Sequence, residues 1–137
     1  MRNRTTARLL ALLVVLSTLV AACSSGTETA TIELVSPDQA AQVIEDAPAG
    51  LVVLDIRTPE EYAEVRLADA INIDFYDADF ADQLDVLDKN DPYVVYCRSG
   101  NRSAEAVETM KELGFVEVYE IDGGIVNWYE SGYSVDS

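Results

Sequence analysis

Short, mostly apolar runs recur along the chain and are separated by amphipathic stretches. The runs have the length of strands, and they lie at 51–56 (LVVLDI), 70–73 (AINI), 93–96 (YVVY) and 116–121 (VEVYEI). The run at 51–56 is almost wholly apolar, which is typical of a strand covered on both faces. Strands alternating with helices predict an α/β fold, a single domain with helices on both faces of a mostly parallel sheet of about five strands.

Helix start signals stand between these runs. Ser36 is placed as an N-cap with Pro37 at the first helical position, and Thr58 and Glu61 have the spacing of a capping box. A further helix is predicted from about residue 103 to Gly114, a residue type that suits a C-terminal turn. Apolar side chains recur at helical spacing along it: Ala104, Val107, Met110 and Leu113.

The segment 74–91 (DFYDADFADQLDVLDKND) is rich in aspartate but does not have the pattern of a calcium loop. It lacks the D-x-D-x-D-G arrangement with a later bidentate glutamate. Phe80, Leu84 and Leu87 fall on one helical face instead. The segment is therefore predicted to be a short helix whose acidic face meets water: Asp79, Asp82, Asp85 and Asp88.

The first 22 residues have the pattern of a secretory signal, with three arginines before an apolar run from Leu9 to Ala22. That run is shorter than the ~20 residues needed to cross a bilayer, so a permanent membrane helix is the weaker alternative. The sequence LVAAC ending at Cys23 resembles the lipobox of bacterial lipoproteins. Acylation of Cys23 would tether residues 32–137, the folded domain, to a membrane through a linker at 23–31. The protein would then be extracytoplasmic and lipid-anchored; in the alternative, an ordinary signal cut leaves Cys23 as a bystander.

The charge and the residue types present narrow the function further. The formal net charge is −16, and without residues 1–22 the chain has six basic and 25 acidic residues, a net charge of −19. Such a body repels nucleic acid and anionic lipid head groups, so neither is expected as a partner. The chain has no histidine, which excludes imidazole metal sites, catalytic triads and Cys–His dyads. No metal and no cofactor is expected.

Cys97 is the one cysteine besides Cys23, and it ends the strand-like run YVVY. The carboxyl edge of a parallel strand is where ligands bind in open α/β sheets. The next residues, RSGNR, contain a glycine that allows a tight turn, and a helix N-terminus follows. Inward N–H groups, the helix dipole and two arginines would all favour the thiolate, so the pKa of Cys97 should be depressed. The alternative is an inert cysteine that ends a buried strand.

The stretch CRSGNRSA resembles the active-site loop of single-domain rhodaneses, which are thiosulfate sulfurtransferases and related persulfide carriers. VVLDIRTPEEY, AINI and GGIVNWYESGYSV resemble other parts of that family in the same order, so the likeness covers about residues 32–135. The resemblance implies that Cys97 is the nucleophile and sulfur carrier. It also implies that the donor is a small sulfur anion, thiosulfate or a persulfide, and that a thiol or cyanide accepts the sulfur.

The same resemblance assigns roles to the neighbouring residues. The backbone amides of the loop would cradle the persulfide, and they belong to Arg98, Ser99, Gly100, Asn101, Arg102 and Ser103. Arg98 and Arg102 would also hold the dianionic donor, and Arg102 would close the loop. Asp55 and Arg57 occupy the family's Asp-x-Arg position and are interpreted as a structural ion pair. The signature residues Gly123, Gly124 and Trp128 are interpreted as packing and turn residues.

The chain departs from the family before AINI, where a Gly-His pair and a proline-glycine turn are usual. Val65 and Arg66 stand at the place of Gly-His, and Asp69 replaces the glycine. We expect this difference to affect the shape of the turn and the substrate preference, because Arg66 would add a cation near the mouth of the site.

Two other functions stay open. A cysteine phosphatase also sets a cysteine and an arginine around a loop of amides, but with Cys-x5-Arg spacing, whereas Cys97 and Arg102 are spaced Cys-x4-Arg. The chain also shows no evident loop aspartate that could serve as a general acid. A non-turnover persulfide carrier or redox-sensing binding module is the second alternative, and it would keep the same cysteine.

Overall fold

The computed structural model describes residues 29–137. The predicted signal at 1–22, the lipidation site Cys23 and most of the predicted linker lie outside these residues. The secondary structure runs in the order β1 (Thr31–Val35), α1 (Pro37–Asp46), β2 (Val52–Asp55), α2 (Pro59–Glu64), β3 (Ile71–Asn72), α3 (Phe80–Asp85), β4 (Pro92–Tyr96), α4 (Asn101–Glu112), β5 (Glu117–Ile121) and α5 (Gly124–Glu130).

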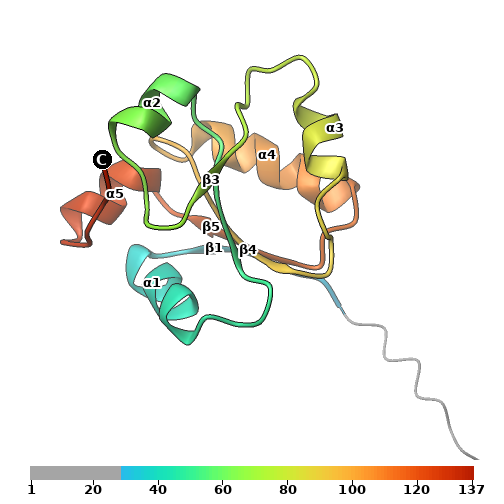
Figure 1. Ribbon diagram of the computed structural model, residues 1–137. Helices are drawn as coiled ribbons and strands as arrows, with labels where there is room; N and C mark the ends of the chain where they lie inside the picture. Colours follow the sequence, from blue (N-terminus) through green and yellow to red (C-terminus); the bar gives the residue numbers. More distant parts are fainter. Residues whose placement is uncertain (1–28) are drawn as a thin grey trace, which may run out of the picture.

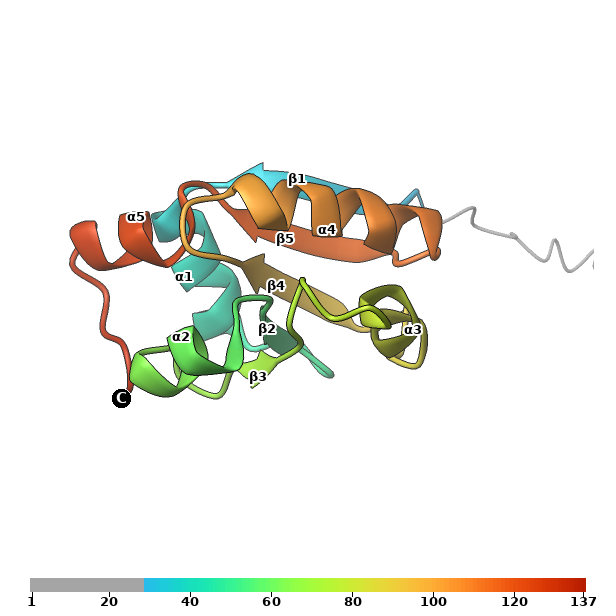
Figure 2. The ribbon, with the colours of Figure 1, turned by 90° about the horizontal axis from the view of Figure 1, so that it is seen from above.

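The five strands form one parallel sheet in the order β1-β5-β4-β2-β3. One apolar cluster joins the sheet to α3 and α4, and a second joins its other face to α1, α2 and α5 (Figure 1). Figure 2 shows α4 lying along β5 and β1 on one side of the sheet. The predicted α/β class, the parallel sheet and the helices on both faces are confirmed.

Helices α1 and α2 begin as their cap residues predict. The side chains of Ser36 and Thr58 each accept a hydrogen bond from the third helical residue, and in both helices a capping box is complete with proline at the start. In α3, Phe80 and Leu84 are buried, and the four aspartates predicted to meet water are exposed: Asp79, Asp82, Asp85 and Asp88.

Helix α4 begins two residues earlier than predicted. Gly100 is its N-cap, in the left-handed region with φ of +100°, so the chain turns into the helix directly after the loop. The buried face of α4 is also shifted, because Ala104 is exposed while Ser103 and Ala106 are buried. Arg102 therefore lies in the first turn of α4 rather than in a loop before it.

Strand β1 and helix α5 are elements that the hydrophobic pattern alone did not indicate. Strand β1 begins at Thr31, one residue before the expected start of the domain, and its Thr31 N–H donates to the Val116 carbonyl at 2.7 Å. Within residues 29–137 no helix combines the length and apolar character that crossing a bilayer requires.

Candidate active site

Cys97 follows β4 directly and lies at the carboxyl edge of the sheet. Strands β2 and β4 are paired in parallel register with Asp55 opposite Tyr96, so the residues after both strands meet at this edge. Sequence positions 55–57 and 97–103, which are far apart along the chain, are thereby brought together. The end of the run YVVY predicts this position for Cys97, whereas only the resemblance placed Asp55 and Arg57 near it.

The sulfur of Cys97 is surrounded by polar groups of its own loop. The Gly100 N–H donates to Sγ at 3.1 Å, and the Ser103 hydroxyl oxygen lies 3.5 Å from Sγ. Burial alone would raise the pKa of the Cys97 thiol. The hydrogen bond between Sγ and the Ser103 side chain, together with those from the backbone N–H groups of Ser103, Gly100 and Ser99, outweighs burial, so the pKa of Cys97 lies below its ordinary value.

The inert alternative predicts a buried cysteine, and Cys97 is only 1% exposed. It does not predict polar donors around the sulfur, because a cysteine that merely fills the core needs none. The hydrogen bonds to Sγ therefore favour a sulfur that carries negative charge. The burial has its own consequence: a donor reaches Sγ only if it is small or if the loop moves.

Arg102 is held by a carboxylate of another helix. Its guanidinium makes two hydrogen bonds to Glu61 of α2, at 2.8 and 2.9 Å, and lies over the Tyr76 ring. These bonds lower the pKa of Glu61 from 4.5 to about 2. Arg102 thus links the loop to α2. The guanidinium edge that could bind an anion already holds the Glu61 carboxylate.

Arg98 and Asn101 are exposed, and Ser99 is exposed between Arg98 and Gly100. Ser103 is fully buried and faces the sheet. The six loop residues predicted to bind substrate are therefore divided. Gly100 and Ser103 contact the sulfur, Arg102 contacts α2, and Arg98, Ser99 and Asn101 present their side chains outward.

Asp55 and Arg57 form a buried ion pair beside the loop. Asp55 accepts hydrogen bonds from the Arg57 backbone N–H, from the Arg57 guanidinium and from the Tyr96 hydroxyl, the last at 2.7 Å. Arg57 also donates to the Val65 carbonyl, and the Tyr96 oxygen accepts from the Leu67 N–H. This network links β2, β4 and the chain after α2, so the ion pair has a structural role.

The start of α5 packs against the backbone of the loop. The N–H groups of Ile125 and Val126 donate to the carbonyls of Cys97 and Arg98, at 2.9 and 3.2 Å. A Cβ atom on Gly124 would lie 2.5 Å from the Cys97 carbonyl oxygen, and Gly124 has φ of +61°. Only glycine permits both this close approach and this backbone conformation. Trp128 is buried and donates to the Ser134 carbonyl.

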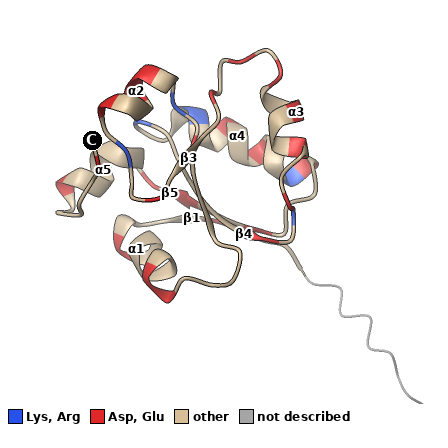
Figure 3. Cartoon of the chain, viewed as in Figure 1, with Lys and Arg blue, Asp and Glu red and all other residues tan. Residues whose placement is uncertain are grey.

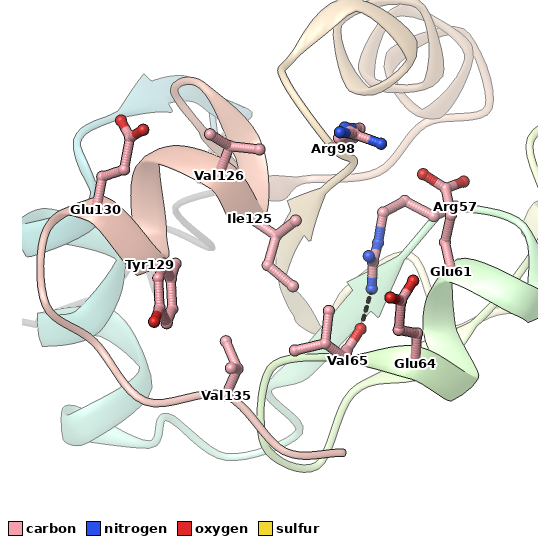
Figure 4. Close-up of a pocket in the computed structure, with 10 residues that line it drawn as sticks. All are labelled: Arg57, Glu61, Glu64, Val65, Arg98, Ile125, Val126, Tyr129, Glu130 and Val135. Carbon is pink, nitrogen blue, oxygen red and sulfur yellow. Dashed lines mark hydrogen bonds between the residues drawn. The ribbon is translucent and has the colours of Figure 1, made fainter.

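A pocket of about 450 Å³ lies beside the loop, between α2 and α5 (Figure 4). Its apolar wall comes mainly from α5 and the C-terminal segment, and Arg98 projects from the loop side. The lining residues are Arg57, Glu61, Glu64, Val65, Arg98, Ile125, Val126, Tyr129, Glu130 and Val135. Cys97 does not line it, so the pocket adjoins the sulfur site without exposing Sγ.

The turn that departs from the family pattern contains a residue with positive φ. Asp69 has φ of +58°, the left-handed conformation that a glycine would adopt, and aspartate tolerates it better than most residues. Arg66 does not line the pocket: its guanidinium lies over the Tyr62 ring, and its backbone pairs with Asp136. The expectation that Arg66 places a cation at the mouth of the site is therefore wrong for this pocket, whose cation on the loop side is Arg98.

Figure 3 shows acidic positions on all of α1 to α4, whereas several basic positions lie near α2 and the start of α4.

Two site residues were not found from the sequence. Glu61 was recognised only as a capping residue, and Glu120, a buried carboxyl bonded to Ser103, was not recognised at all. An acid inside the strand-like run VEVYEI was the one signal that pointed to Glu120.

The fold and the site define a class of α/β proteins that hold a cysteine between the end of a parallel strand and the start of a helix. The family described as Rhodanese-like domain matches residues 36–131, and the chain belongs to this family. Among its relatives, thiosulfate sulfurtransferase GlpE of Pseudomonas aeruginosa (strain LESB58) is 35% identical over 107 residues, 78% of this chain and 92% of that protein. Thiosulfate sulfurtransferase GlpE of Pseudomonas syringae pv. syringae (strain B728a) is 36% identical over 93 residues, 67% of this chain and 83% of that protein.

A solved structure of a rhodanese-related protein from Thermoplasma volcanium superposes with a TM-score of 0.66 at 32% identity. The match covers 76% of this chain and 97% of that one. The family and these relatives support sulfurtransferase chemistry in general for this chain.

Proposed function

We propose that the protein transfers sulfane sulfur from a small anionic donor, thiosulfate or a persulfide, to a thiol or cyanide through a persulfide on Cys97. The single observation that carries this proposal is the set of hydrogen-bond donors around Sγ, which favour the thiolate. The two curated relatives named above, both thiosulfate sulfurtransferases, support thiosulfate as the donor.

The chemistry proceeds in two displacements. The Cys97 thiolate attacks the outer sulfur of thiosulfate, an S–S bond forms, and sulfite leaves with the electron pair of the bond that breaks. The acceptor then attacks the terminal sulfur of the persulfide, and Cys97 leaves as a thiolate. The N–H of Gly100 stabilises negative charge on Sγ at the beginning and at the end of this cycle.

The test is steady-state formation of thiocyanate from thiosulfate and cyanide. We expect turnover by the wild-type chain and none by Cys97→Ser. Arg98→Ala should raise KM for thiosulfate more than it lowers kcat, because Arg98 is the exposed cation of the loop. Asn101→Ala, at the exposed first residue of α4, is the matched control and should change KM little. Equal activity of Cys97→Ser and wild type would refute the proposal.

The burial of Cys97 favours one second candidate, a non-turnover persulfide carrier or redox-sensing module. A cysteine that is 1% exposed exchanges sulfur slowly with bulky partners. This candidate predicts that Cys97 gains sulfur from thiosulfate, or becomes oxidised, while cyanide gives no sustained turnover. Sustained turnover would exclude it in favour of the enzyme.

We further propose that residues 1–22 are removed and that Cys23 is acylated, which would anchor the domain at the outer side of a cell membrane. The support is the charged and apolar pattern of residues 1–22 and the small residues before Cys23. Membrane fractionation tests it: Cys23→Ala should move the protein out of the membrane fraction, whereas Ser24→Ala should leave it there.

A further inference from the structure

Glu120 is a buried carboxyl that the proposed chemistry does not use. It lies on β5, is 7% exposed, and its Oε1 accepts a hydrogen bond of 2.6 Å from the Ser103 hydroxyl. That hydroxyl oxygen is in turn 3.5 Å from the sulfur of Cys97. A continuous chain of polar atoms therefore joins the nucleophile to a carboxyl on the neighbouring strand, across the first turn of α4.

Ser103 has fewer hydrogens than it has neighbours that can accept one. A serine hydroxyl donates a single hydrogen bond. Its oxygen lies within hydrogen-bond distance of Glu120 Oε1 and of the Gly100 carbonyl at 3.1 Å, and it also faces Cys97 Sγ. The direction of the hydrogen bond between Ser103 and Cys97 thus depends on whether Glu120 is protonated.

Two arrangements of the proton satisfy this chain. When Glu120 is a carboxylate, Ser103 donates to it, and the Cys97 thiol donates its S–H to the Ser103 oxygen. When Glu120 is a carboxylic acid, it donates to Ser103, and Ser103 donates to a Cys97 thiolate. Both arrangements contain the same atoms and the same single negative charge; only the position of the protons differs.

The surroundings of Glu120 favour the protonated acid. Burial raises its pKa first, the hydrogen bond from Ser103 lowers it, and the carboxylate of Asp122 raises it further. The cross-strand neighbours are apolar, Leu34 on β1 and Val95 on β4, and the side chain of α4 that touches it is that of Ser103. Asp122 is thus the only charged group shown to act on Glu120 among the described residues.

We propose that Glu120 is a positioning residue that stores the thiol proton of Cys97 through Ser103. The proton on Sγ passes to Ser103 Oγ, the Ser103 hydroxyl proton passes to Glu120 Oε1, and the reverse transfer reprotonates Cys97. This inference rests on the proposed function, in which Cys97 is the nucleophile. It explains how an acidic, buried position stays next to an anionic sulfur: the pair carries one charge, not two.

The test is the pH profile of Cys97 alkylation by iodoacetamide in the full chain, with no sulfur donor present. For wild type we expect the rate to rise in two steps, because two coupled groups lose protons. Glu120→Gln keeps the shape of the side chain but removes the group that takes up the proton, so one step should remain. Alkylation near neutral pH should be faster than in wild type, because no neighbouring carboxylate disfavours the Cys97 thiolate. Glu112→Gln, at an exposed position on α4, should keep the wild-type profile.

A double-mutant cycle shows whether the effect passes through Ser103. In a Ser103→Ala background, Glu120→Gln should change the alkylation profile much less than it does in wild type. If Glu120→Gln fails to fold, the isotope-labelled wild-type chain still provides a readout. The carboxyl carbon of Glu120 and the Cβ of Cys97 should then shift over the same pH interval.

Two results would overturn the inference: identical one-step profiles for wild type and Glu120→Gln, or a Glu120 that titrates independently of Cys97. These results are separate from those that concern the proposed function. Alkylation needs no sulfur transfer, so a two-step profile without thiocyanate formation would reject the proposed function and leave the proton store in place. If wild type forms thiocyanate normally but Glu120→Gln has the same alkylation profile as wild type, the proton store is rejected and the proposed function stands.

Discussion

Asp55 is the central acceptor of the hydrogen-bond network at the carboxyl edge of the sheet. It is fully buried and accepts hydrogen bonds from Arg57 and from the Tyr96 hydroxyl. A buried charge pair of this kind contributes little net stability compared with an apolar pair of the same size. Loss of one partner is costly, however, because the other charge stays buried without compensation.

Asp55→Asn should therefore destabilise the fold strongly. The change keeps the size of the side chain but leaves the Arg57 guanidinium without its counter-ion, at a cost of about 3 kcal/mol. Urea unfolding measures the loss. Asp82→Asn, at an exposed position of α3, should stay within about 0.5 kcal/mol of wild type. A loss for Asp55→Asn no larger than that control would contradict the account of the network.

Cys97 and its loop could be proposed as a site from the sequence because their signal is local: a strand end, a glycine and two arginines lie within seven positions. The sequence pointed to the Asp55–Arg57 ion pair only through the family's Asp-x-Arg position. Glu61 and Glu120 were not assigned to this site because their contacts are tertiary. Glu61 of α2 binds Arg102 of α4, and Glu120 of β5 accepts a hydrogen bond from Ser103 of α4. No local pattern encodes these contacts.

Helix α2 is fixed to α4 by one carboxylate. Glu61 completes the capping box by accepting from the Thr58 N–H, and it also binds the Arg102 guanidinium. Because the pKa of Glu61 falls to about 2 in the folded protein, its contribution to stability is present above the ordinary value of 4.5. That contribution is lost as the pH falls from 4.5 through about 2.

Glu61→Gln isolates this ion pair, since glutamine also serves in a capping box. At about pH 6 we expect the variant to be less stable than wild type by about 1 kcal/mol, and at about pH 2 most of this difference should be gone. Unfolding in urea at both pH values checks this. Glu60→Gln, the exposed neighbour, is the control. A difference that is independent of pH would show that Glu61 acts through packing rather than charge.

Helix α5 holds the loop through its first turn, where Gly124 approaches the Cys97 carbonyl. Gly124→Ala should both strain the backbone and displace the loop, so stability and the rate of Cys97 alkylation should fall together. Gly132→Ala is a matched control, because Gly132 also has positive φ but has no atom within 4 Å of an added Cβ. We expect the free energy of unfolding to fall by about 1 kcal/mol for Gly132→Ala and by clearly more for Gly124→Ala. Equal losses in urea unfolding would refute the close approach as the cause.

The helices with cap signals, α1 and α2, could be predicted from the sequence nearly to the residue. Helix α5 could not, because it begins at a pair of glycines, and glycine ordinarily disfavours helices. Strand β1 is a short edge strand whose exposed positions are Glu33 and Leu34, so its side chains do not alternate between an apolar and a polar face. The tertiary contacts of these two elements, with β5 and with the active-site loop, determine their structure.

The overall architecture followed from the alternation of strands and helices, because parallel strands need crossover helices.

The acidic composition affects the electrostatic field around the whole molecule. Near the loop, Arg57 and Arg102 are already paired with carboxylates, whereas Glu64 and Glu130 are exposed at the pocket. The field met by an anionic donor is therefore repulsive overall, with Arg98 as the local exception.

Salt should for this reason speed the reaction with thiosulfate. We expect kcat/KM for this dianion to rise between roughly 0.01 M and roughly 0.15 M ionic strength, because screening weakens the repulsion. The combined variant Glu64→Gln, Glu130→Gln should show a smaller rise. A fall of kcat/KM with salt would mean that attraction by Arg98 dominates the approach of the donor.

The most direct test of the central claim, that Cys97 is an anionic nucleophile which carries sulfane sulfur, is the intact mass of the protein after incubation with thiosulfate. Wild type should gain the mass of one sulfur atom, Cys97→Ser should gain none, and cyanide should remove the added sulfur. An unchanged wild-type mass, or an equal gain by Cys97→Ser, would contradict the claim.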